Sequence, residues 1–208
     1  MKIFFDLDGP ILDVSQRYYQ VFLAICKRNV VLGKEEFWEC KRERISWSEI
    51  LKKAKVSIPK ERFMKYWMCY IEMRRYLILD KIQPYVKQVL RFFGKRHILY
   101  LVSIRQSKRN LLWQLRKFKI EKYFRKVVHC KHTFNMPWKE KARLVMEFLR
   151  PKEDGLMIGD TEVDIRAAKI AGIKSIGITN GIRTERILKR EKADFLISNL
   201  NEVFQILT

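Results

Sequence analysis

In this 208-residue chain, the stretch that indicates the fold most clearly is Phe4-Phe5-Asp6-Leu7-Asp8-Gly9-Pro10. Ile3 to Phe5 form an apolar run of strand-forming residues, and two aspartates and a glycine follow soon after it. A buried parallel strand delivers polar residues to the carboxyl edge of its sheet in this way, and ligands of open α/β sheets bind at that edge. Because Asp6 and Asp8 are two residues apart, we expect both side chains to leave a regular strand on the same side. Two crowded carboxylates repel each other unless a cation or a shared proton relieves them.

A second acidic cluster follows another apolar strand much later in the chain. The run Leu156 to Ile158 precedes Gly159, and Asp160 and Asp164 come after it. These two acids stand at positions i and i+4 where we expect a helix to begin, so they share one face of its first turn. A helix N-terminus also favours acids that bind nothing, and Asp-x-Asp pairs are common in surface loops. Two strands that both end in paired carboxylates predict instead one hard-cation site with oxygen ligands suited to Mg²⁺.

The bulk composition predicts a folded cytoplasmic protein without membrane segments. Hydrophobic residues make up 48% of the chain. No apolar run approaches the ~20 residues that cross a bilayer. We find no signal peptide ahead of the first strand. The four cysteines are widely spaced and form no C-x-x-C pair, so we interpret them as reduced thiols.

The net charge of +21 is concentrated in one block of the sequence. Between Lys87 and Arg143 there are 17 lysines and arginines and only two acids, Glu121 and Glu140. A basic block favours anionic partners, nucleic acid among them. The alternative is an ordinary solvated surface in a lysine-rich, heat-adapted protein. The scarcity of glutamate in the block argues a little against that alternative.

The remaining pattern predicts an α/β fold that is interrupted by a helical insertion. Between residues 14 and 81 the apolar residues recur at helical spacing and nothing indicates a strand. We expect Ser15 to be an N-cap of one helix there, Ser46 or Ser48 to cap a short helix, and Pro59 to open a long one. From residue 84 onwards, helices alternate with strands expected near 98–102, 127–128, 155–159, 174–179 and 193–197.

This alternation sets the expected fold class and domain organisation. Strands that alternate with helices form right-handed crossovers, which build a parallel sheet with helices on both faces. We therefore expect a Rossmann-like core domain made of residues 1–13 and 82–208. Residues 14–81 should form an inserted all-helical domain, entered directly after the first acid pair.

Two further groups complete a phosphate-binding site at the same edge. Ser103 ends the strand expected near 98–102, so its hydroxyl should point at the edge, although it could also only cap the next helix. Lys139 and Lys141 lie near the start of the helix before the second acidic strand. We favour Lys141, because helical spacing puts it on the buried face formed by Leu144, Val145 and Phe148. Lys139 is the alternative if the helix starts later.

Taken in order, these motifs resemble those of the haloacid dehalogenase (HAD) superfamily, in its phosphoglycolate phosphatase-like branch with a helical cap. The resemblance covers essentially the whole chain, and it implies that residues 14–81 are the cap. It is carried by Asp6-Leu7-Asp8-Gly9, Ser103, a lysine near position 140, and Gly159-Asp160 with Asp164. The chain departs from the family pattern at Pro10, where Thr or Ser is usual, and at Ile104, which replaces a residue that is often polar.

The resemblance implies a Mg²⁺-dependent phosphatase that works through an aspartyl-phosphate. It makes Asp6 the nucleophile and Asp8 the general acid and base. It implies that Mg²⁺ is held by Asp6, the backbone carbonyl of Asp8 and Asp160, with Asp164 supporting that shell or coordinating through water. Ser103 would hydrogen-bond the phosphoryl oxygens, and the lysine would steady both nucleophile and phosphate.

The expected substrate is a small phosphorylated metabolite. We place substrate contacts at Gly9, Ser103, Ile104 and Arg17, with Arg42, Arg44 and Trp47 as further candidates in the helical domain. A sugar-phosphate mutase is a sibling alternative, because it uses the same two aspartates. A nucleic-acid-binding protein, or an end-phosphatase on nucleic acid, would use the basic block 87–143.

Overall fold

The computed structural model describes residues 1–27, 30–130 and 136–207, and the chain divides into two compact units. One unit comprises Met1–Asp13 and Ile82–Thr208, and the other comprises Val14–Lys81. Two short strands, β2 (Leu12–Asp13) and β3 (Lys81–Ile82), pair with each other where the chain passes from one unit to the other. The sequence did not predict these strands, because two residues carry no periodic signal. Part of the basic block, residues 131–135, lies outside the described residues.

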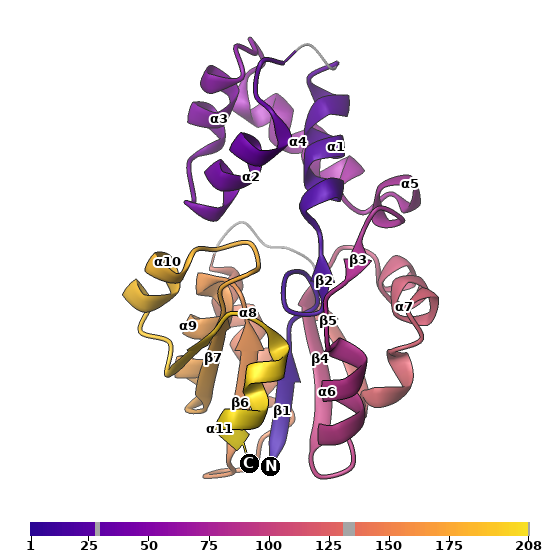
Figure 1. Ribbon diagram of the computed structural model, residues 1–208, viewed down its shortest axis with the longest axis vertical. Helices are drawn as coiled ribbons and strands as arrows, with labels where there is room; N and C mark the ends of the chain where they lie inside the picture. The colour runs from indigo at the N-terminus through magenta and orange to yellow at the C-terminus, as the bar shows by residue number, and fades with distance from the viewer. Residues whose placement is uncertain (28–29, 131–135, 208) are drawn as a thin grey trace. The chain divides into compact units, whose positions relative to one another are not determined.

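The α/β unit is built on a six-stranded sheet with the order β5-β4-β1-β6-β7-β8 (Figure 1). Every described pairing between neighbouring strands of this sheet is parallel, as predicted. In the register of the central strand, Phe5 pairs with Leu101 on one side and with Ile158 on the other. The strands are β1 (Lys2–Phe5), β4 (Ile98–Ile104), β5 (Lys126–Cys130), β6 (Gly155–Gly159), β7 (Lys174–Ile178) and β8 (Phe195–Ile197).

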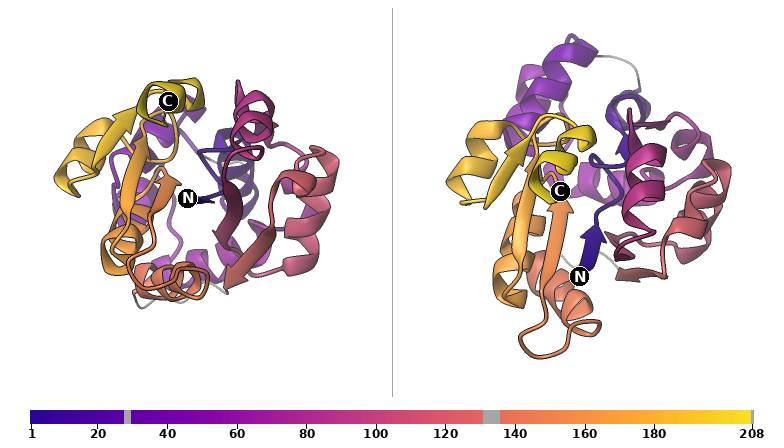
Figure 2. Two further views of the ribbon diagram at one scale, coloured as in Figure 1. Left: turned by 90° about the horizontal axis from the view of Figure 1, so that it is seen from below. Right: turned by 60° about the horizontal axis from the view of Figure 1, so that its bottom comes forward.

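Helices cover both faces of this sheet (Figure 2). Against one face, α8 and α9 bury Leu144 and Ala168 in a cluster with Phe4, Tyr100 and Met157. Against the other face lie α6 and α11, whose Phe93 and Phe204 rings stack 5.1 Å apart. The helices are α6 (Val86–Phe93), α7 (Lys108–Lys117), α8 (Pro137–Met146), α9 (Glu162–Ala171), α10 (Glu185–Arg190) and α11 (Val203–Leu207), with short 3₁₀ turns η1 (Glu121–Tyr123) and η2 (Leu200–Glu202).

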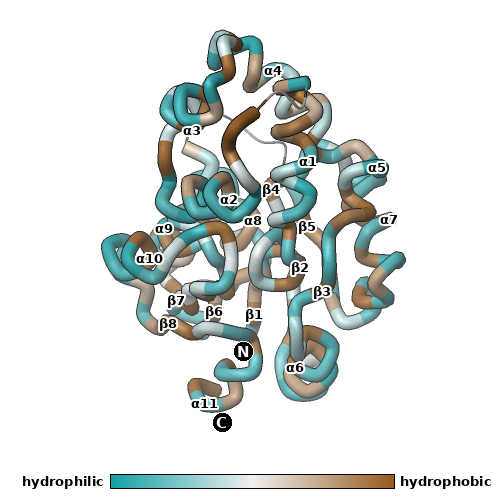
Figure 3. The backbone as a smooth tube through the Cα atoms, turned by 45° about the horizontal axis from the view of Figure 1, so that its top comes forward, coloured by the Kyte–Doolittle hydropathy of each residue, from teal (hydrophilic) through white to brown (hydrophobic). Residues whose placement is uncertain are grey.

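The hydropathy of the chain follows this layered arrangement. In Figure 3, α7 and α10 show hydrophobic and hydrophilic segments in alternation, as expected of helices with one buried face. On α7 the buried side chains include Leu111 and Leu115. The fold class predicted from the sequence, a parallel α/β sheet covered on both faces, is confirmed.

In the second unit the described residues form five helices around an aromatic core of their own. Phe22 and Phe37 stack 4.7 Å apart there, and the ring of Trp47 lies 4.6 Å from that of Trp67. This helical region is consistent with the predicted cap. The helices are α1 (Ser15–Ile25), α2 (Lys34–Arg42), α3 (Trp47–Lys53), α4 (Lys60–Tyr70) and α5 (Arg74–Leu77).

The helix starts of this unit differ in part from those predicted. The prediction of Ser15 as an N-cap was wrong: Val14 occupies that position without a side-chain hydrogen bond, and Ser15 is already helical. Of the two serines considered for α3, Ser46 is the cap, and it forms a reciprocal capping box with Glu49. Among the described residues, no helix is both long and apolar enough to cross a membrane.

Candidate active site

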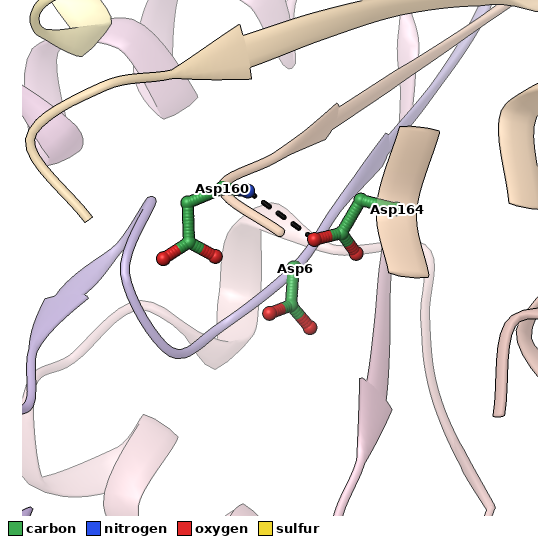
Figure 4. Close-up of side chains that lie close together, drawn as sticks. All are labelled: Asp6, Asp160 and Asp164. Atoms are coloured by element: carbon green, nitrogen blue, oxygen red, sulfur yellow. Dashed lines mark hydrogen bonds between the residues drawn. The ribbon is translucent and has the colours of Figure 1, made fainter. Parts of the chain in front are cut away.

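Three aspartates meet at the carboxyl edge of the sheet (Figure 4). Asp6 directly follows β1, and its N–H continues the ladder by donating to the carbonyl of Ile158 at 2.9 Å. Asp160 directly follows β6, and Asp164 lies in the first turn of α9. Because β1 and β6 are paired neighbours, both strands deliver their acids to the same point. Carboxylate oxygens from the three residues all lie within 4.8 Å of one another.

The carboxylate of Asp164 is held by the start of its own helix. Its Oδ2 accepts hydrogen bonds from the backbone N–H of Asp160 at 3.2 Å and of Thr161 at 3.0 Å. The Thr161 hydroxyl donates to the same oxygen at 2.8 Å and completes a capping box. Asp164 therefore uses one oxygen for the helix start and turns the other, Oδ1, toward the cluster.

Lys141 is the cation that the fold brings to these acids. Its Nζ donates to Asp6 Oδ1 at 2.7 Å and to Asp164 Oδ1 at 2.5 Å, and only 2% of its side chain is exposed. The helix α8 starts at Pro137, which turns Lys141 inward and leaves Lys139 exposed. Of the two lysines considered from the sequence, the structure brings Lys141 to the acidic cluster.

Burial controls the charge state of the cluster. Burial, opposed by Lys141 and reinforced by Asp164, raises the pKa of Asp6 from 3.8 to about 7. Burial, Asp164 and Asp6 raise the pKa of Asp160 well above its ordinary value. Burial disfavours the charge of Lys141 as well, but Asp164 and Asp6 outweigh it and raise the pKa of the ammonium group. Three carboxylates with one ammonium group leave two negative charges when all are ionised.

These properties fit a divalent cation. Asp160 Oδ2 accepts the backbone N–H of Ile182 at 2.5 Å, but Asp160 Oδ1 is buried without a hydrogen-bond partner in the described residues. A buried oxygen without a donor is costly unless a cation or water satisfies it. Carboxylate oxygens are the ligands that Mg²⁺ prefers, and its two positive charges balance the two excess negative charges of the cluster. Asp6, Asp160 and Asp164 are therefore able to hold such an ion.

Two glycines allow the loops to close around Asp160. A Cβ on Gly181 would lie 2.2 Å from Asp160 Oδ2, so only glycine permits the approach that places the Ile182 N–H on this carboxylate. Gly9 approaches the same oxygen from the opposite loop, and its carbonyl accepts a hydrogen bond from the Gln83 side chain at 3.1 Å. A turn at Asn180-Gly181 is foreseeable from the sequence, but its proximity to Asp160 is not.

The second aspartate of the first motif has a partner that sequence reasoning missed. Asp8 Oδ1 accepts a hydrogen bond at 2.5 Å from Nη2 of Arg105, a side chain that is almost fully buried. In the sequence Arg105 is one of 17 basic residues in the block from Lys87 to Arg143, and no local pattern distinguishes it. Asp8 lies three residues beyond the end of β1, so the regular strand geometry expected for Asp6 and Asp8 does not apply.

The other predicted site residues are placed as follows. Ser103 is buried near the end of β4, at the same sheet edge as the acids, and the strand continues through the half-buried Ile104. Arg17 lies inside the helical unit, where its Nε is 3.1 Å from Asp80 and its Nη1 donates to the Ile71 carbonyl at 3.3 Å. That pairing gives no support to a substrate contact by Arg17. Trp47 is partly buried and packs against the core of the helical unit.

A parallel α/β sheet that brings buried carboxylates and a lysine together at its carboxyl edge suits a metal-assisted hydrolase. The chain belongs to the family of haloacid dehalogenase-like hydrolases, whose sequence profile matches residues 3–178. Members of this family typically use a divalent metal, and the cluster of Asp6, Asp160 and Asp164 could hold one.

Several known proteins are similar over nearly the whole chain. "Putative pyrophosphatase PpaX" of Caldanaerobacter subterraneus subsp. tengcongensis is 27% identical over 99% of this chain and 93% of its own length. A phosphorylated carbohydrates phosphatase of Thermotoga maritima is 25% identical over 94% of this chain and 93% of its own. Among solved structures, a haloacid dehalogenase-like hydrolase from Streptococcus pneumoniae shares the fold with a TM-score of 0.80, at 17% identity over 100% of this chain and 98% of that one.

Proposed function

We propose that this protein is a Mg²⁺-dependent phosphatase that hydrolyses a small phosphomonoester through an aspartyl-phosphate on Asp6. The observation that carries the proposal is the contact between Lys141 and two members of a buried triad of acids at the sheet edge. The triad matches a divalent cation, and the cation together with Lys141 gives a site for the phosphoryl group. The relatives named as phosphatases support the same reaction class.

In this proposal Asp6, Asp160 and the backbone carbonyl of Asp8 hold the ion, and Asp164 supports them. When bound, Mg²⁺ neutralises charge on the phosphoryl oxygens and helps to orient the phosphoryl group. Lys141 favours the ionised form of Asp6 and orients its carboxylate, because its Nζ lies 2.7 Å from Asp6 Oδ1. Ser103 is assigned to hydrogen-bond a phosphoryl oxygen, since it lies buried at the same edge.

The reaction then proceeds in two displacements at phosphorus, the first by Asp6 and the second by water. An oxygen of Asp6 attacks phosphorus while the bond to the leaving oxygen breaks, and Asp8 donates a proton to that oxygen. Asp8, now a carboxylate, takes a proton from a water molecule that attacks the phosphorus of the aspartyl-phosphate. Phosphate leaves, and Asp6 is restored as a carboxylate.

The substrate class is proposed from the names of the relatives. They include a pyrophosphatase, a phosphatase of phosphorylated carbohydrates and phosphoglycolate phosphatases. We therefore infer a small phosphorylated metabolite, with the helical unit selecting it as a cap. A panel of phosphoglycolate, sugar phosphates and pyrophosphate would distinguish these subclasses by kcat/KM.

The test of the reaction is hydrolysis of p-nitrophenyl phosphate with Mg²⁺ and with EDTA. We expect turnover only with the metal, and none in Asp6→Asn, which keeps the shape of residue 6 but removes the nucleophile. Asp154→Asn is the matched control, because Asp154 is an exposed acid just before β6 and should leave turnover unchanged. Wild-type turnover in Asp6→Asn would rule out the nucleophile assignment.

A further inference from the structure

Arg105, a buried arginine to which the reaction proposed above assigns no role, contacts Asp8. Only 3% of its surface is exposed, and its Nη2 lies 2.5 Å from Asp8 Oδ1. The same nitrogen donates at 3.1 Å to Gln114, a fully buried residue of α7. The ring Nδ1 of His129, at the end of β5, lies 3.3 Å from the carbonyl oxygen of Arg105. Residues from β5 and α7 thus hold Arg105 in place against Asp8.

The other donors of Arg105 are unusual for an ion pair that only stabilises the fold. Its Nε and Nη1 are buried and have no hydrogen-bond partner among the described residues. Buried donors without partners destabilise a protein, and each such group calls for an explanation. Well-packed apolar residues often replace buried ion pairs without loss of stability. The arrangement is therefore better explained by a role in the site than by stability.

We propose that Arg105 is a positioning residue, which orients the Asp8 carboxyl group for proton transfer to the leaving oxygen of the substrate. This rests on the function proposed above, in which Asp8 is the general acid. A guanidinium group is planar, permanently charged, and donates in fixed directions, so its contact restricts the rotation of a carboxyl group. Arg105 keeps its charge and its protons throughout the step.

Because Asp8 protonates the leaving oxygen, the effect of changing Arg105 should depend on how basic the leaving group is. As the bond from phosphorus to the leaving oxygen breaks, an alkyl substrate releases a basic alkoxide that needs the proton of Asp8. A p-nitrophenyl substrate releases a phenolate whose charge is delocalised, and this group departs without the proton. Misorienting Asp8 therefore slows alkyl phosphates much more than p-nitrophenyl phosphate.

The experiment compares kcat/KM for glycerol phosphate and p-nitrophenyl phosphate in matched variants. In Arg105→Met we expect a loss on the order of 10²-fold for the alkyl substrate, the scale of a catalytic group displaced by about 1 Å. The aryl substrate should lose much less. Arg105→Lys keeps the charge and should recover part of the alkyl activity. Arg116→Met is the control, because Arg116 on α7 also donates to a carboxylate, that of Glu121, but in an exposed ion pair.

Asp8→Asn shows how the two substrates respond when residue 8 can no longer donate a proton. A double variant tests whether Arg105 acts through Asp8. If Arg105 acts through Asp8, adding Arg105→Met to Asp8→Asn causes no further loss on the alkyl substrate. Equal losses on the two substrates in Arg105→Met, or additive losses in the double variant, would overturn the proposal. Thermal unfolding reports whether each variant is folded. If Arg105→Met does not fold, the single variants Arg105→Lys and Gln114→Leu are compared on the same two substrates instead. Absence of wild-type turnover on both substrates would instead remove the proposed function, and the role of Arg105 with it.

Discussion

Gly9 lies directly against the carboxylate of Asp160: a Cβ built on Gly9 would stand 1.8 Å from Asp160 Oδ2. The φ angle of Gly9 is +100°, a conformation that other residues rarely adopt. The loop after β1 and the residue after β6 thus meet only because position 9 has no side chain. This contact fixes one side of the carboxylate that we assign to the metal.

Gly9→Ala should therefore damage the metal site. The added methyl group must displace the Asp160 carboxylate, and we expect a loss of activity on the order of 10²-fold together with weaker Mg²⁺ binding. Calorimetric Mg²⁺ titration and p-nitrophenyl phosphate assays measure the two effects. Gly33→Ala is the control, because Gly33 has open space around it and a φ of −70°. Wild-type Mg²⁺ affinity in Gly9→Ala would contradict the close-contact argument.

A substitution at Gly172 tests the strain of a positive φ angle alone, because an added Cβ would not clash with neighbouring side chains there. It ends α9 with a φ of +68°, and outside its immediate chain neighbours and the backbone of its own helix, no heavy atom of the described residues lies within 4 Å of a Cβ built there. We expect Gly172→Ala to lower the free energy of unfolding by about 1 kcal/mol through strain alone. Activity at a temperature where the variant is folded should equal that of the wild type. Urea unfolding gives the stability, and a lower kcat would show that strain at Gly172 reaches the site.

Lys141→Met should make the stability of the protein depend strongly on metal. Removing the ammonium group leaves three buried carboxylates without their cation. Breaking a buried ion pair in this way lowers the free energy of unfolding by about 3 kcal/mol. Saturating Mg²⁺ should restore part of that loss, so the shift in Tm on adding the ion should exceed the wild-type shift. Lys139→Met is the matched control, since Lys139 is exposed and should change stability by less than about 0.5 kcal/mol. A similar destabilisation in both variants would argue against a special role for Lys141.

The raised pKa of Asp6 predicts how pH affects the metal-free protein. The folded-state pKa is about 7, above the ordinary value of 3.8, so the folded state favours the protonated carboxyl group. The contribution of Asp6 to stability is therefore fully present below about pH 4 and is lost as pH rises through about 7. Asp160, whose pKa is also raised, acts in the same direction. Urea unfolding between pH 4 and 8 in EDTA should show this decline, and Asp6→Asn should reduce it.

Metal binding should release protons for the same reason. Mg²⁺ binds ionised carboxylates, so its affinity should rise with pH up to about the pKa of Asp6, near 7. Titration calorimetry at pH 6 in two buffers of different ionisation enthalpy measures the number of protons released. Asp6→Asn should release fewer, whereas equal heats in the two buffers for the wild type would contradict a raised pKa.

The capping box of α3 gives a prediction for the helical unit. Ser46→Ala removes the side-chain acceptor of the Glu49 N–H and the partner of its carboxylate, and should cost about 1 kcal/mol of stability. Ser48→Ala, two residues further on, lies inside the helix and should have little effect. Thermal unfolding of the two variants compares them directly. An equal loss in both would show that the box does not govern the start of α3.

Much of this site could be predicted from sequence because its parts are local patterns. Asp6 and Asp160 each directly follow a short apolar strand, and strand hydrophobicity depends only on neighbouring residues. Parallel strands place their carboxyl ends at one edge, so the convergence of the two acids follows from the fold class. Lys141 was favoured over Lys139 by helical spacing, and it lies on the buried face as expected.

The errors in the prediction have equally local causes. The cap of α1 was misplaced by one residue, because a serine at a helix start is compatible with either the N-cap or the first helical position. The strands β2 and β3 were missed, because each has two residues and is defined by its partner across the chain. No property of either segment alone distinguishes it from a loop.

The sequence by itself determined the α/β class, the acids at the strand ends and the lysine on the buried helix face, since periodicity and strand hydrophobicity act over a few residues. Only the tertiary structure decided that Arg105 reaches Asp8 and that the Ile182 N–H reaches Asp160. Those contacts join residues 97 and 22 positions apart. They depend on which loops meet after the sheet has formed, and close packing of the loops, as at Gly9, is a property of the assembled fold.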